Sequence, residues 1–274
     1  MSVFSTSVSF SAGVRRYFCV AVLLLLIPGA IPAQNKKLVI AVEDDAAPWS
    51  GADGTGYANE IVRAAFGAVD IEVEFQVVPY ARCKYLAVSG NVPACFSMSP
   101  SPEFSEDIEL SAKPLFTCFA GYFYNVNKPP RVSRPEDLPA RTVVGTVIGY
   151  EYPPSLESLI KKGIVVPEES TSENLNLKKL AAGRFDFALL NYNETKSPEW
   201  LIARADLDGK VKLAFHAGVL RSHIGFSKKH LDGMWARQQF DRGHRLIKAN
   251  GTLRRIQKEW SQKLARENQT KAGG

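Results

Sequence analysis

Residue types that build metal, redox and nucleophilic sites are scarce in this sequence. Four histidines and four cysteines occur among 274 residues, and neither a CxxC nor a GxSxG motif is present. The histidines are scattered between His216 and His244, so they do not have the spacing of metal ligands. We therefore expect no metal site and no cofactor.

Long apolar runs are also absent, except near the N-terminus. No acidic residue precedes Arg15 and Arg16, and the run FCVAVLLLLIPGAIPA occupies residues 18–33. Basic residues, a short apolar stretch and then small residues are typical of a secretory signal peptide. Two prolines make the run too short for a transmembrane helix. We expect residues 1–33 to be removed near Ala33, by either the general or the twin-arginine export route.

Charge of one sign is not in large excess once the signal peptide is removed. The formal net charge of +6 falls to +4 without Arg15 and Arg16. The basic residues do not cluster with aromatic residues, and their densest groups lie on helical faces near the C-terminus, which is typical of a solvated surface. We expect no nucleic-acid partner.

Alternating strand and helix patterns follow the predicted signal peptide. Short alternating or β-branched runs predict strands, and apolar residues at helical spacing predict helices. Short connections between such elements are typical of a parallel sheet covered by helices. The predicted strands of this first unit are 37–43, 71–79 and 93–99, and its predicted helices are 57–69 and 80–90.

A second unit repeats this pattern and closes with further helices. It consists of a strand at 141–149, a helix at 155–163, a strand at 164–170, and a helix followed by a strand within 174–191. Helices on either side of Gly251 then complete the chain. Both units are therefore predicted to be α/β.

Two extended stretches connect the two units. Residues 114–130, rich in aromatic residues, lead out of the first unit, and residues 211–230 lead back to it. Two α/β lobes joined by two crossing strands form a hinge with a cleft between them. We predict lobe 1 over residues 36–117 and 222–264, lobe 2 over 118–221, and a disordered tail over 265–274.

Three cysteines remain after removal of the signal peptide. In an oxidising compartment two of them are expected to pair and one to be left over. Cys83 lies on the sheet-facing side of its helix, and Cys95 lies on the strand that follows. A bridge between them would add about 3 kcal/mol by restricting the unfolded chain. We expect the Cys83–Cys95 pair, with pairing through Cys118 left open as the alternative.

Six short segments occur in an order that resembles one known family. They are APW at 47–49, PYAR at 79–82, SMSPSPE at 97–103, VGTVIG at 144–149, LAAGRFDFALLN at 180–191 and ANGTLRRIQKEW at 249–260. In this order the chain resembles the periplasmic solute-binding proteins of ABC importers, the polar amino-acid type called family 3. The resemblance covers nearly the whole mature chain.

The resemblance implies both a fold and a role. The fold would be the type II periplasmic-binding-protein fold, with two Rossmann-like lobes joined by two hinge strands. The role would be to capture a small molecule in the interlobe cleft by hinge closure and to deliver it to an inner-membrane ABC permease. The resemblance further implies a periplasmic location and a monomeric chain.

Two positions depart from the pattern of the family. After the third strand the family usually has Thr-Pro-Glu-Arg, and its arginine holds the α-carboxylate of the ligand through paired charge-assisted hydrogen bonds. Phe104 stands at that position here, and Glu103 precedes it. Asn191 replaces the acid that usually binds the ammonium group of the ligand, while Asp186 matches a structural aspartate. We therefore do not expect an ordinary α-amino acid as ligand.

Polar candidates for ligand binding lie in the loops after the predicted strands, where ligands of α/β sheets bind. Ser97 and Ser99 would hydrogen-bond a ligand, or alternatively cap the next turn. Glu43 would bind a cationic group, and Asn191 would offer an amide. Arg82 would partly replace the missing cation, or alternatively form a surface salt bridge.

Aromatic candidates surround the same predicted cleft. Tyr80 and Trp49 would stack on a ligand or, alternatively, pack against the sheet, and Tyr150 and Tyr192 lie in loops of lobe 2. With Phe104 in place of the arginine, the cleft becomes a pocket of rings and neutral hydrogen-bonding groups. Such a pocket suits a ligand with an apolar or cationic body and few anionic groups.

Three functions are compatible with this sequence. The favoured one is a solute-binding protein for a small polar or aromatic solute. An orphan periplasmic sensor or binding partner would use the same fold, and genomic neighbours would separate the two. A dehydratase-like enzyme would need a placed acid or base together with an anion clamp. Glu43, Glu103 and Glu151 are acids, but the clamp arginine is missing, so we expect no enzyme.

Overall fold

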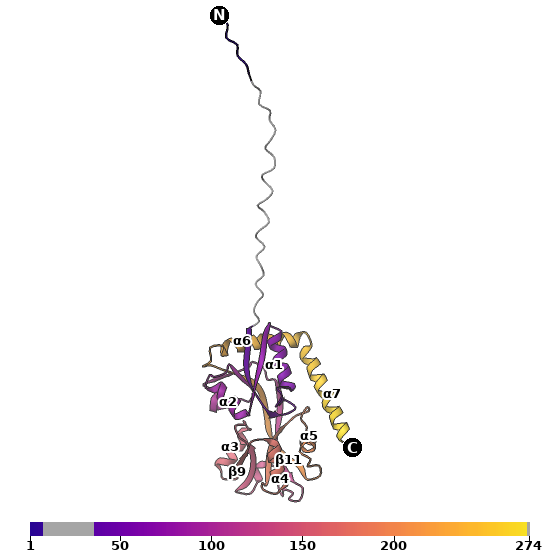
Figure 1. Ribbon diagram of the computed structural model, residues 1–274. Helices are drawn as coiled ribbons and strands as arrows, with labels where there is room; N and C mark the ends of the chain where they lie inside the picture. Colours follow the sequence, from indigo (N-terminus) through magenta and orange to yellow (C-terminus); the bar gives the residue numbers. More distant parts are fainter. Residues whose placement is uncertain (8–35, 273–274) are drawn as a thin grey trace. The chain divides into compact units, whose positions relative to one another are not determined.

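The computed structural model describes residues 1–7 and 36–272, and the chain divides into the units Met1–Gln34 and Asn35–Gly274 (Figure 1). Residues 1–7 form no helix or strand, and the rest of the predicted signal peptide lies outside the described residues. All helices and strands of the described residues belong to the second unit. Among these described helices, none is both long and apolar enough to cross a bilayer.

Three parallel strands form the sheet of the first lobe. β1 (Lys36–Glu43) pairs with β4 (Ile71–Val78) along its whole length and with β5 (Ala94–Met98) on its other side. α1 (Tyr57–Gly67) and α2 (Tyr80–Val88) connect the strands, and both bury one face. The pattern of strands and helices predicted for residues 37–99 is confirmed.

The second lobe repeats this arrangement with its own parallel strands. β8 (Thr142–Val147) pairs with β9 (Val165–Ser170) on one side and with β10 (Phe187–Tyr192) on the other. α3 (Pro154–Lys161) and α4 (Glu173–Ala181) connect these strands. In Figure 1, α3 and α4 lie in one half of the body formed by Asn35–Gly274, and α1 and α2 lie in the other half.

Two long antiparallel strands link the lobes. β7 (Phe116–Asn125) pairs with β11 (Val211–Ser227), which also pairs with β5 and with β6 (Ile108–Leu110) at its C-terminal end. The resulting strand order is β4–β1–β5–β11–β7–β10–β8–β9, with β6 beside β11. The predicted α/β fold, with two lobes joined by two crossing strands, is therefore confirmed.

Several short elements have no counterpart among the predictions. They are the hairpin of β2 (Asp45–Ala46) and β3 (Ser50–Gly51), the strand β6, the 3-10 turns η1 (Pro102–Phe104) and η2 (Pro135–Asp137), and the helix α5 (Pro198–Arg204). Each is too short to show a periodic apolar pattern, which is the signal that predicts elements from sequence. The β2–β3 hairpin follows β1 of the first lobe and borders the site described below.

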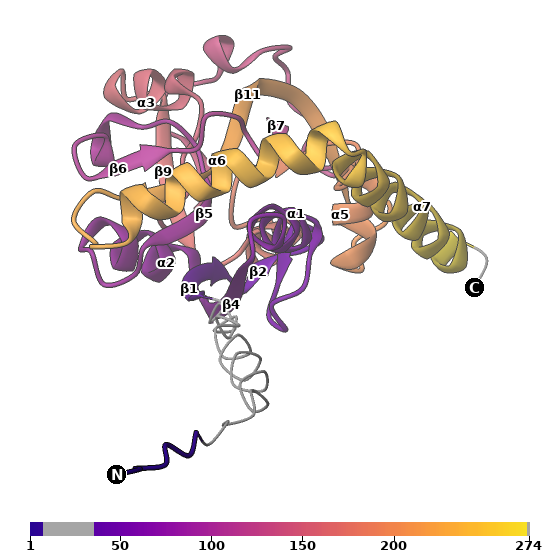
Figure 2. The same cartoon turned by 90° about the horizontal axis from the view of Figure 1, so that it is seen from above.

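Two helices complete the chain after β11. α6 (Gly233–Ala249) and α7 (Thr252–Ala272) lie on either side of Gly251, as the sequence predicts. α7 continues to Ala272, so residues 265–272 are helical where a disordered tail was predicted. Figure 2 shows α6 close to α1, and the two helices pack together.

The contact between α1 and α6 depends on a glycine. A Cβ atom at Gly243 would lie 1.8 Å from the carbonyl oxygen of Ala65, a distance at which the helices must move apart. We expect Gly243→Ala to lower the free energy of unfolding by about 1–3 kcal/mol, because overpacking strains a close-packed core. Urea unfolding followed by circular dichroism measures this change.

Gly67 provides the matched control for this prediction. It ends α1 and has no atom within 4 Å of the position that a Cβ would take. Gly67→Ala should leave the stability unchanged or raise it by up to about 1 kcal/mol through helix propensity. Equal effects of the two substitutions would contradict the close approach at Gly243.

The cysteines pair as the sequence analysis favours. Cys83 in α2 and Cys95 in β5 form a disulfide, with Cα atoms 5.6 Å apart. Among the described residues, Cys118 is the free cysteine, and it is buried. Burial raises the pKa of the Cys118 thiol to about 12, so this thiol stays protonated and unreactive near neutral pH.

Candidate ligand-binding site

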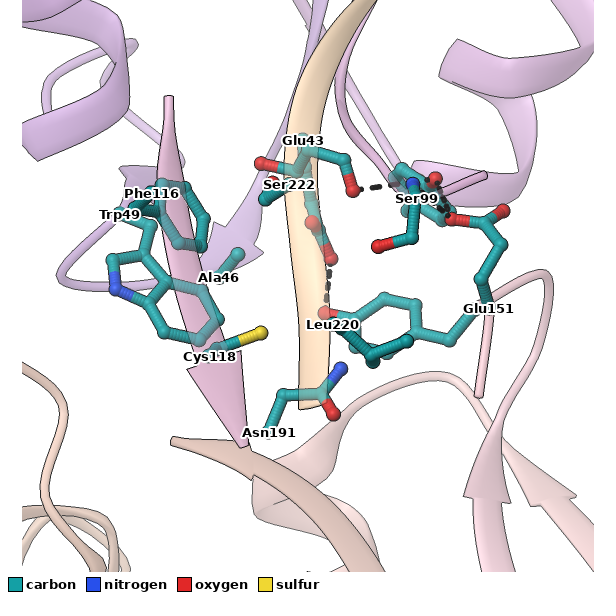
Figure 3. Close-up of a pocket in the computed structure, with 13 residues that line it drawn as sticks. Glu43, Ala46, Trp49, Ser99, Phe116, Cys118, Glu151, Asn191, Leu220 and Ser222 are labelled. Carbon is teal, nitrogen blue, oxygen red and sulfur yellow. Dashed lines mark hydrogen bonds between the residues drawn. The ribbon is translucent and has the colours of Figure 1, made fainter. Parts of the chain in front are cut away.

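A cavity lies between the lobes, where the strands of both sheets end. β1, β5, β7, β10 and β11 each contribute residues to it, together with the β2–β3 hairpin, the start of α2 and the loop after β8 (Figure 3). Its lining consists of Glu43, Ala46, Trp49, Tyr80, Ser97, Ser99, Phe116, Cys118, Tyr150, Glu151, Asn191, Leu220 and Ser222. The C-terminal ends of the parallel strands are the expected position for a site in such sheets.

The cavity is small because side chains from the two lobes meet in it. About 30 Å³ remains in which the centre of a water-sized sphere fits, and one water molecule needs roughly 10–15 Å³ by this measure. There is thus room for about two water molecules. A solute larger than this can occupy the place only if some of the lining moves.

Glu43 is a buried acid at the end of β1. Its residue is 5 % exposed, and its carboxylate accepts a hydrogen bond from the Tyr150 hydroxyl of the second lobe. Among the described residues, no lysine or arginine forms an ion pair with it. Burial raises the pKa of Glu43 to about 8, although the bond from Tyr150 favours the charged form. Glu43 is therefore a carboxyl group that a cation would stabilise in its charged form.

Glu151 is a second buried acid, and it is well paired. Its Oε2 atom accepts hydrogen bonds from the Tyr80 hydroxyl at 2.7 Å and from the Ser99 backbone N–H at 3.0 Å. Its Oε1 atom lies 3.3 Å from the ammonium group of Lys84. Burial raises the pKa of Glu151, and these three contacts oppose that change.

Lys84 is the cation of this cluster and was missed in the sequence. It lies one helical turn after Tyr80 in α2, so both side chains leave the same face of the helix. Its ammonium group donates to the Gly149 carbonyl at 2.8 Å and to Glu103 at 3.1 Å, and it lies 5.8 Å from the centre of the Phe104 ring. The spacing of four residues from Tyr80 is the signal that would have found it.

A third buried acid, Glu173, is neutralised by Lys196. The two side chains form an ion pair in which Lys196 is 1 % exposed. Glu173 also accepts a hydrogen bond from the Asn191 backbone N–H at 2.7 Å, which fixes the end of β10 at the cavity. Across the cleft, the Lys196 ammonium lies 4.2 Å from the centre of the Trp49 ring, and the Trp49 indole donates to Thr195 at 3.3 Å. Neither Glu173 nor Lys196 was predicted.

Three polar atoms of the cavity lining lack hydrogen-bond partners within the described part of the chain. They are the hydroxyl oxygens of Ser97 and Ser222 and the side-chain carbonyl oxygen of Asn191. Ser97 also has a positive φ of 73°, a conformation that non-glycine residues seldom adopt and that is concentrated at functional sites. The Asn191 oxygen and an ionised Glu43 accept hydrogen bonds, and the two serine hydroxyls can accept or donate them, so the lining can bind a ligand that carries donor groups.

Comparisons with known proteins support the fold of this chain. No protein-family model matches the chain, and no curated protein matches its sequence. Among solved structures, a histidine kinase sensor domain similar to periplasmic binding proteins matches with a TM-score of 0.69 and 20 % identity, covering 82 % of this chain and 96 % of its own. An ancestral arginine-binding protein bound to arginine matches with a TM-score of 0.69 and 16 % identity, covering 82 % and 98 %.

A third match is an amino-acid ABC transporter substrate-binding protein of Streptococcus pneumoniae bound to L-arginine. Its TM-score is 0.65 at 16 % identity, and the match covers 83 % of this chain and 95 % of that one. The chain has the periplasmic-binding-protein fold. The cavity described above lies at the junction of the two lobes.

Seven of the ten predicted site residues line the cavity of this periplasmic-binding-protein fold. They are Glu43, Trp49, Tyr80, Ser97, Ser99, Tyr150 and Asn191. They come together because each lies at or just after the end of a strand, where the two sheets face each other. Whether they bind a ligand stays a prediction.

The other three predicted residues lie outside the cavity. Arg82 is exposed and stacks over the ring of Tyr85, because it leaves α2 on the face opposite to Tyr80. Phe104 is 3 % exposed and packs in the core beneath α2. Tyr192 points to the other side of β10, where its hydroxyl bonds His216. These three positions correct the predicted lining.

Proposed function

We propose that this chain is a periplasmic solute-binding protein that captures a small polar or aromatic solute bearing a cationic group. Glu43 is the observation that carries this proposal. It is a buried carboxyl group in the cavity, and no lysine or arginine of the described residues forms an ion pair with it. Burying a charge without a partner is costly, so a ligand cation would supply what this position lacks.

The aromatic lining supports the same class of ligand. Trp49, Tyr80 and Tyr150 border the cavity, and the rings of Tyr80 and Tyr150 lie edge to face with centres 5.3 Å apart. Ring faces attract cations and flat apolar groups with about 0.5–2 kcal/mol per contact. The unpaired oxygen of Asn191 would accept a hydrogen bond from the ligand.

Capture would proceed by a hinge motion about β7 and β11. We place the lobe boundaries at residues 117/118 and 221/222, next to the pair that Thr117 of β7 forms with Arg221 of β11. Lobe 1 then comprises 36–117 and 222–264, and lobe 2 comprises 118–221. A ligand drives closure only through contacts that it makes better in the closed state. The hydrogen bond between Glu43 of lobe 1 and Tyr150 of lobe 2 would bring both lobes into contact with such a ligand.

The proposed role includes a location and a partner. The basic and apolar pattern of residues 1–33 supports export to the periplasm with cleavage near Ala33, and the solved transporter substrate-binding protein with this fold supports delivery to an inner-membrane ABC permease. We propose that the chain acts as a monomer and binds no nucleic acid.

A thermal-shift screen of the mature chain, residues 34–274, tests the proposal. The panel holds standard amino acids, polyamines, quaternary amines, aromatic acids and small peptides. A ligand that binds the folded state raises the melting temperature by mass action. Stabilisation by amines and not by acids is expected. Strong stabilisation by the standard amino acids, or by acids alone, would contradict it.

A sensory role is the second candidate, because one of the solved structures with this fold is a sensor domain. A sensory role predicts the same ligand as a transport role, but a different effect on uptake when the protein is deleted. Deletion of a transport protein abolishes uptake of the radiolabelled ligand, whereas deletion of a sensor leaves uptake intact and removes only a response. Measuring uptake of the ligand from the screen decides between the two.

A further inference from the structure

The side chain of Glu151 crosses from the second lobe into a set of donors on the first lobe. Its carboxylate receives the Tyr80 hydroxyl at 2.7 Å, the Ser99 N–H at 3.0 Å and the Lys84 ammonium at 3.3 Å. The side chain is 7 % exposed. Three donors of different types therefore converge on one carboxylate that is almost fully removed from water; Figure 3 shows the Glu151 side chain beside Ser99.

These donors belong to rigid parts of the first lobe. Tyr80 and Lys84 lie on one face of α2, and the disulfide at Cys83 fixes this helix to β5. The Ser99 N–H follows β5 directly. Tyr80 is the first residue of α2, where the helix dipole also favours an anion. The three donors are thus held by elements of the first lobe alone, namely α2 and the end of β5.

Loss of the Glu151 carboxylate would leave the donors without an adequate partner. Lys84 would retain the Gly149 carbonyl at 2.8 Å and the Glu103 carboxylate at 3.1 Å. Glu103 is 67 % exposed in its side chain, so water screens this pair. The buried Tyr80 hydroxyl and Ser99 N–H would lack the acceptor that they now share, which costs free energy in a buried place.

We propose that Glu151 acts as an internal ligand, which occupies the anion site of the first lobe and so excludes solutes that carry a carboxylate there. This inference rests on the proposed function, since it names the specificity of the same cleft. Glu151 then decides the class of solute: its carboxylate fills the anion site, and Glu43 is left to select a cation without a carboxylate of its own.

Glu151 could instead act solely as a tie between the lobes. A tie predicts that its removal loosens closure and adds no new binding. An internal ligand predicts that its removal creates an affinity for small external carboxylates. The two roles therefore differ in the sign of a binding change, which an experiment can measure without knowledge of the natural solute.

The experiment compares the mature wild-type chain with Glu151→Ala, using sodium acetate and sodium formate as probes and sodium chloride at equal ionic strength as reference. Thermal shift and isothermal titration are the measurements. For wild type we expect no carboxylate-specific effect. For Glu151→Ala we expect saturable binding of acetate, at least about tenfold tighter than in wild type. Glu151→Ala/Lys84→Met should lose this gain.

Glu103→Ala is the matched control, because it removes the other carboxylate on Lys84 without vacating the buried donors. It should gain no affinity for acetate. An equal gain in Glu103→Ala would overturn the inference, because a change of net charge alone would then explain it. A folded Glu151→Ala that binds no acetate would overturn it as well.

A second variant keeps the test decisive if Glu151→Ala does not fold. Glu151→Gln retains the shape of the side chain and loses its charge, so acetate should compete with it and bind measurably. Absence of acetate binding in folded Glu151→Gln would then overturn the inference.

Titration of the same proteins with amines separates this inference from the proposed function. Amine binding by wild type without an acetate gain in the variants would reject the internal ligand alone, and the reverse result would reject the cationic solute alone.

Discussion

Replacement of Glu43 by glutamine should weaken the binding of a quaternary amine at pH 8.5 by about 30-fold or more. Removal of one partner of a buried charge pair costs about 2–5 kcal/mol, and 1.4 kcal/mol corresponds to a factor of ten. Glutamine keeps the shape of the side chain and loses the charge. Isothermal titration with a permanently charged amine measures the effect, because such a ligand does not titrate itself.

The affinity of wild type for the same amine should depend on pH, because Glu43 must be ionised to bind a cation. The pKa of Glu43 is raised to about 8 by burial, so in the unliganded protein the group is mostly protonated at pH 7 and must lose its proton when a cation binds. Affinity should therefore rise about tenfold per pH unit below pH 8 and level off above it. Glu43→Gln should show no such rise.

The stability of the unliganded protein should change in the opposite direction. The unfolded chain releases the Glu43 proton from its ordinary pKa of 4.5 upward, whereas the folded chain holds it to about pH 8. Wild type should thus lose about 1.4 kcal/mol of stability per pH unit across this window relative to Glu43→Gln.

The control for both experiments is Asp45→Asn, an exposed change of the same charge. A flat affinity profile in wild type, or an equal loss of affinity in the control, would contradict the role of Glu43.

Replacement of Lys196 by methionine should lower the free energy of unfolding by about 3–5 kcal/mol, because it leaves Glu173 as an unpaired buried charge. The two side chains are 1 % and 5 % exposed. The contact of Lys196 with the Trp49 ring is lost as well. Urea unfolding followed by circular dichroism is the measurement.

Two further variants define this result. Lys161→Met breaks an exposed ion pair with Glu157 and should cost less than about 1 kcal/mol. Glu173→Gln in the Lys196→Met background removes the stranded charge and should restore most of the loss. A change below about 1 kcal/mol in Lys196→Met would mean that water reaches the pair.

Much of the fold could be predicted because its signals are local. The alternation of β1 and the apolar face of α1 depend on neighbouring residues along the chain, and so do the crossing strands β7 and β11. The hairpin β2–β3 and the helix α5 span too few residues to show a period. A contact with a distant segment holds the turn of the hairpin, where the Trp49 indole donates to Thr195.

The lining of the cavity was predicted in part for the same reason. The ends of strands could be located in the sequence, so Glu43, Tyr80 and Asn191 were expected at the place where they line the cavity. Lys84 and Lys196 were missed, because a lysine is expected at the surface unless its acidic partner is known. The partner of Lys84 is Glu151, which lies 67 positions away. The position of Phe104 suggested a lost clamp, and Lys84 beside its ring supplies a cation there instead.

A crystal structure of the mature protein with a primary amine from the screen tests the proposed ligand site most directly. We expect the ammonium group within hydrogen-bond distance of the Glu43 carboxylate, with Glu151 still held by Tyr80, Ser99 and Lys84. A ligand whose ammonium group lies away from Glu43, or whose own carboxylate takes the place of Glu151 on the Ser99 N–H, would contradict the site described here.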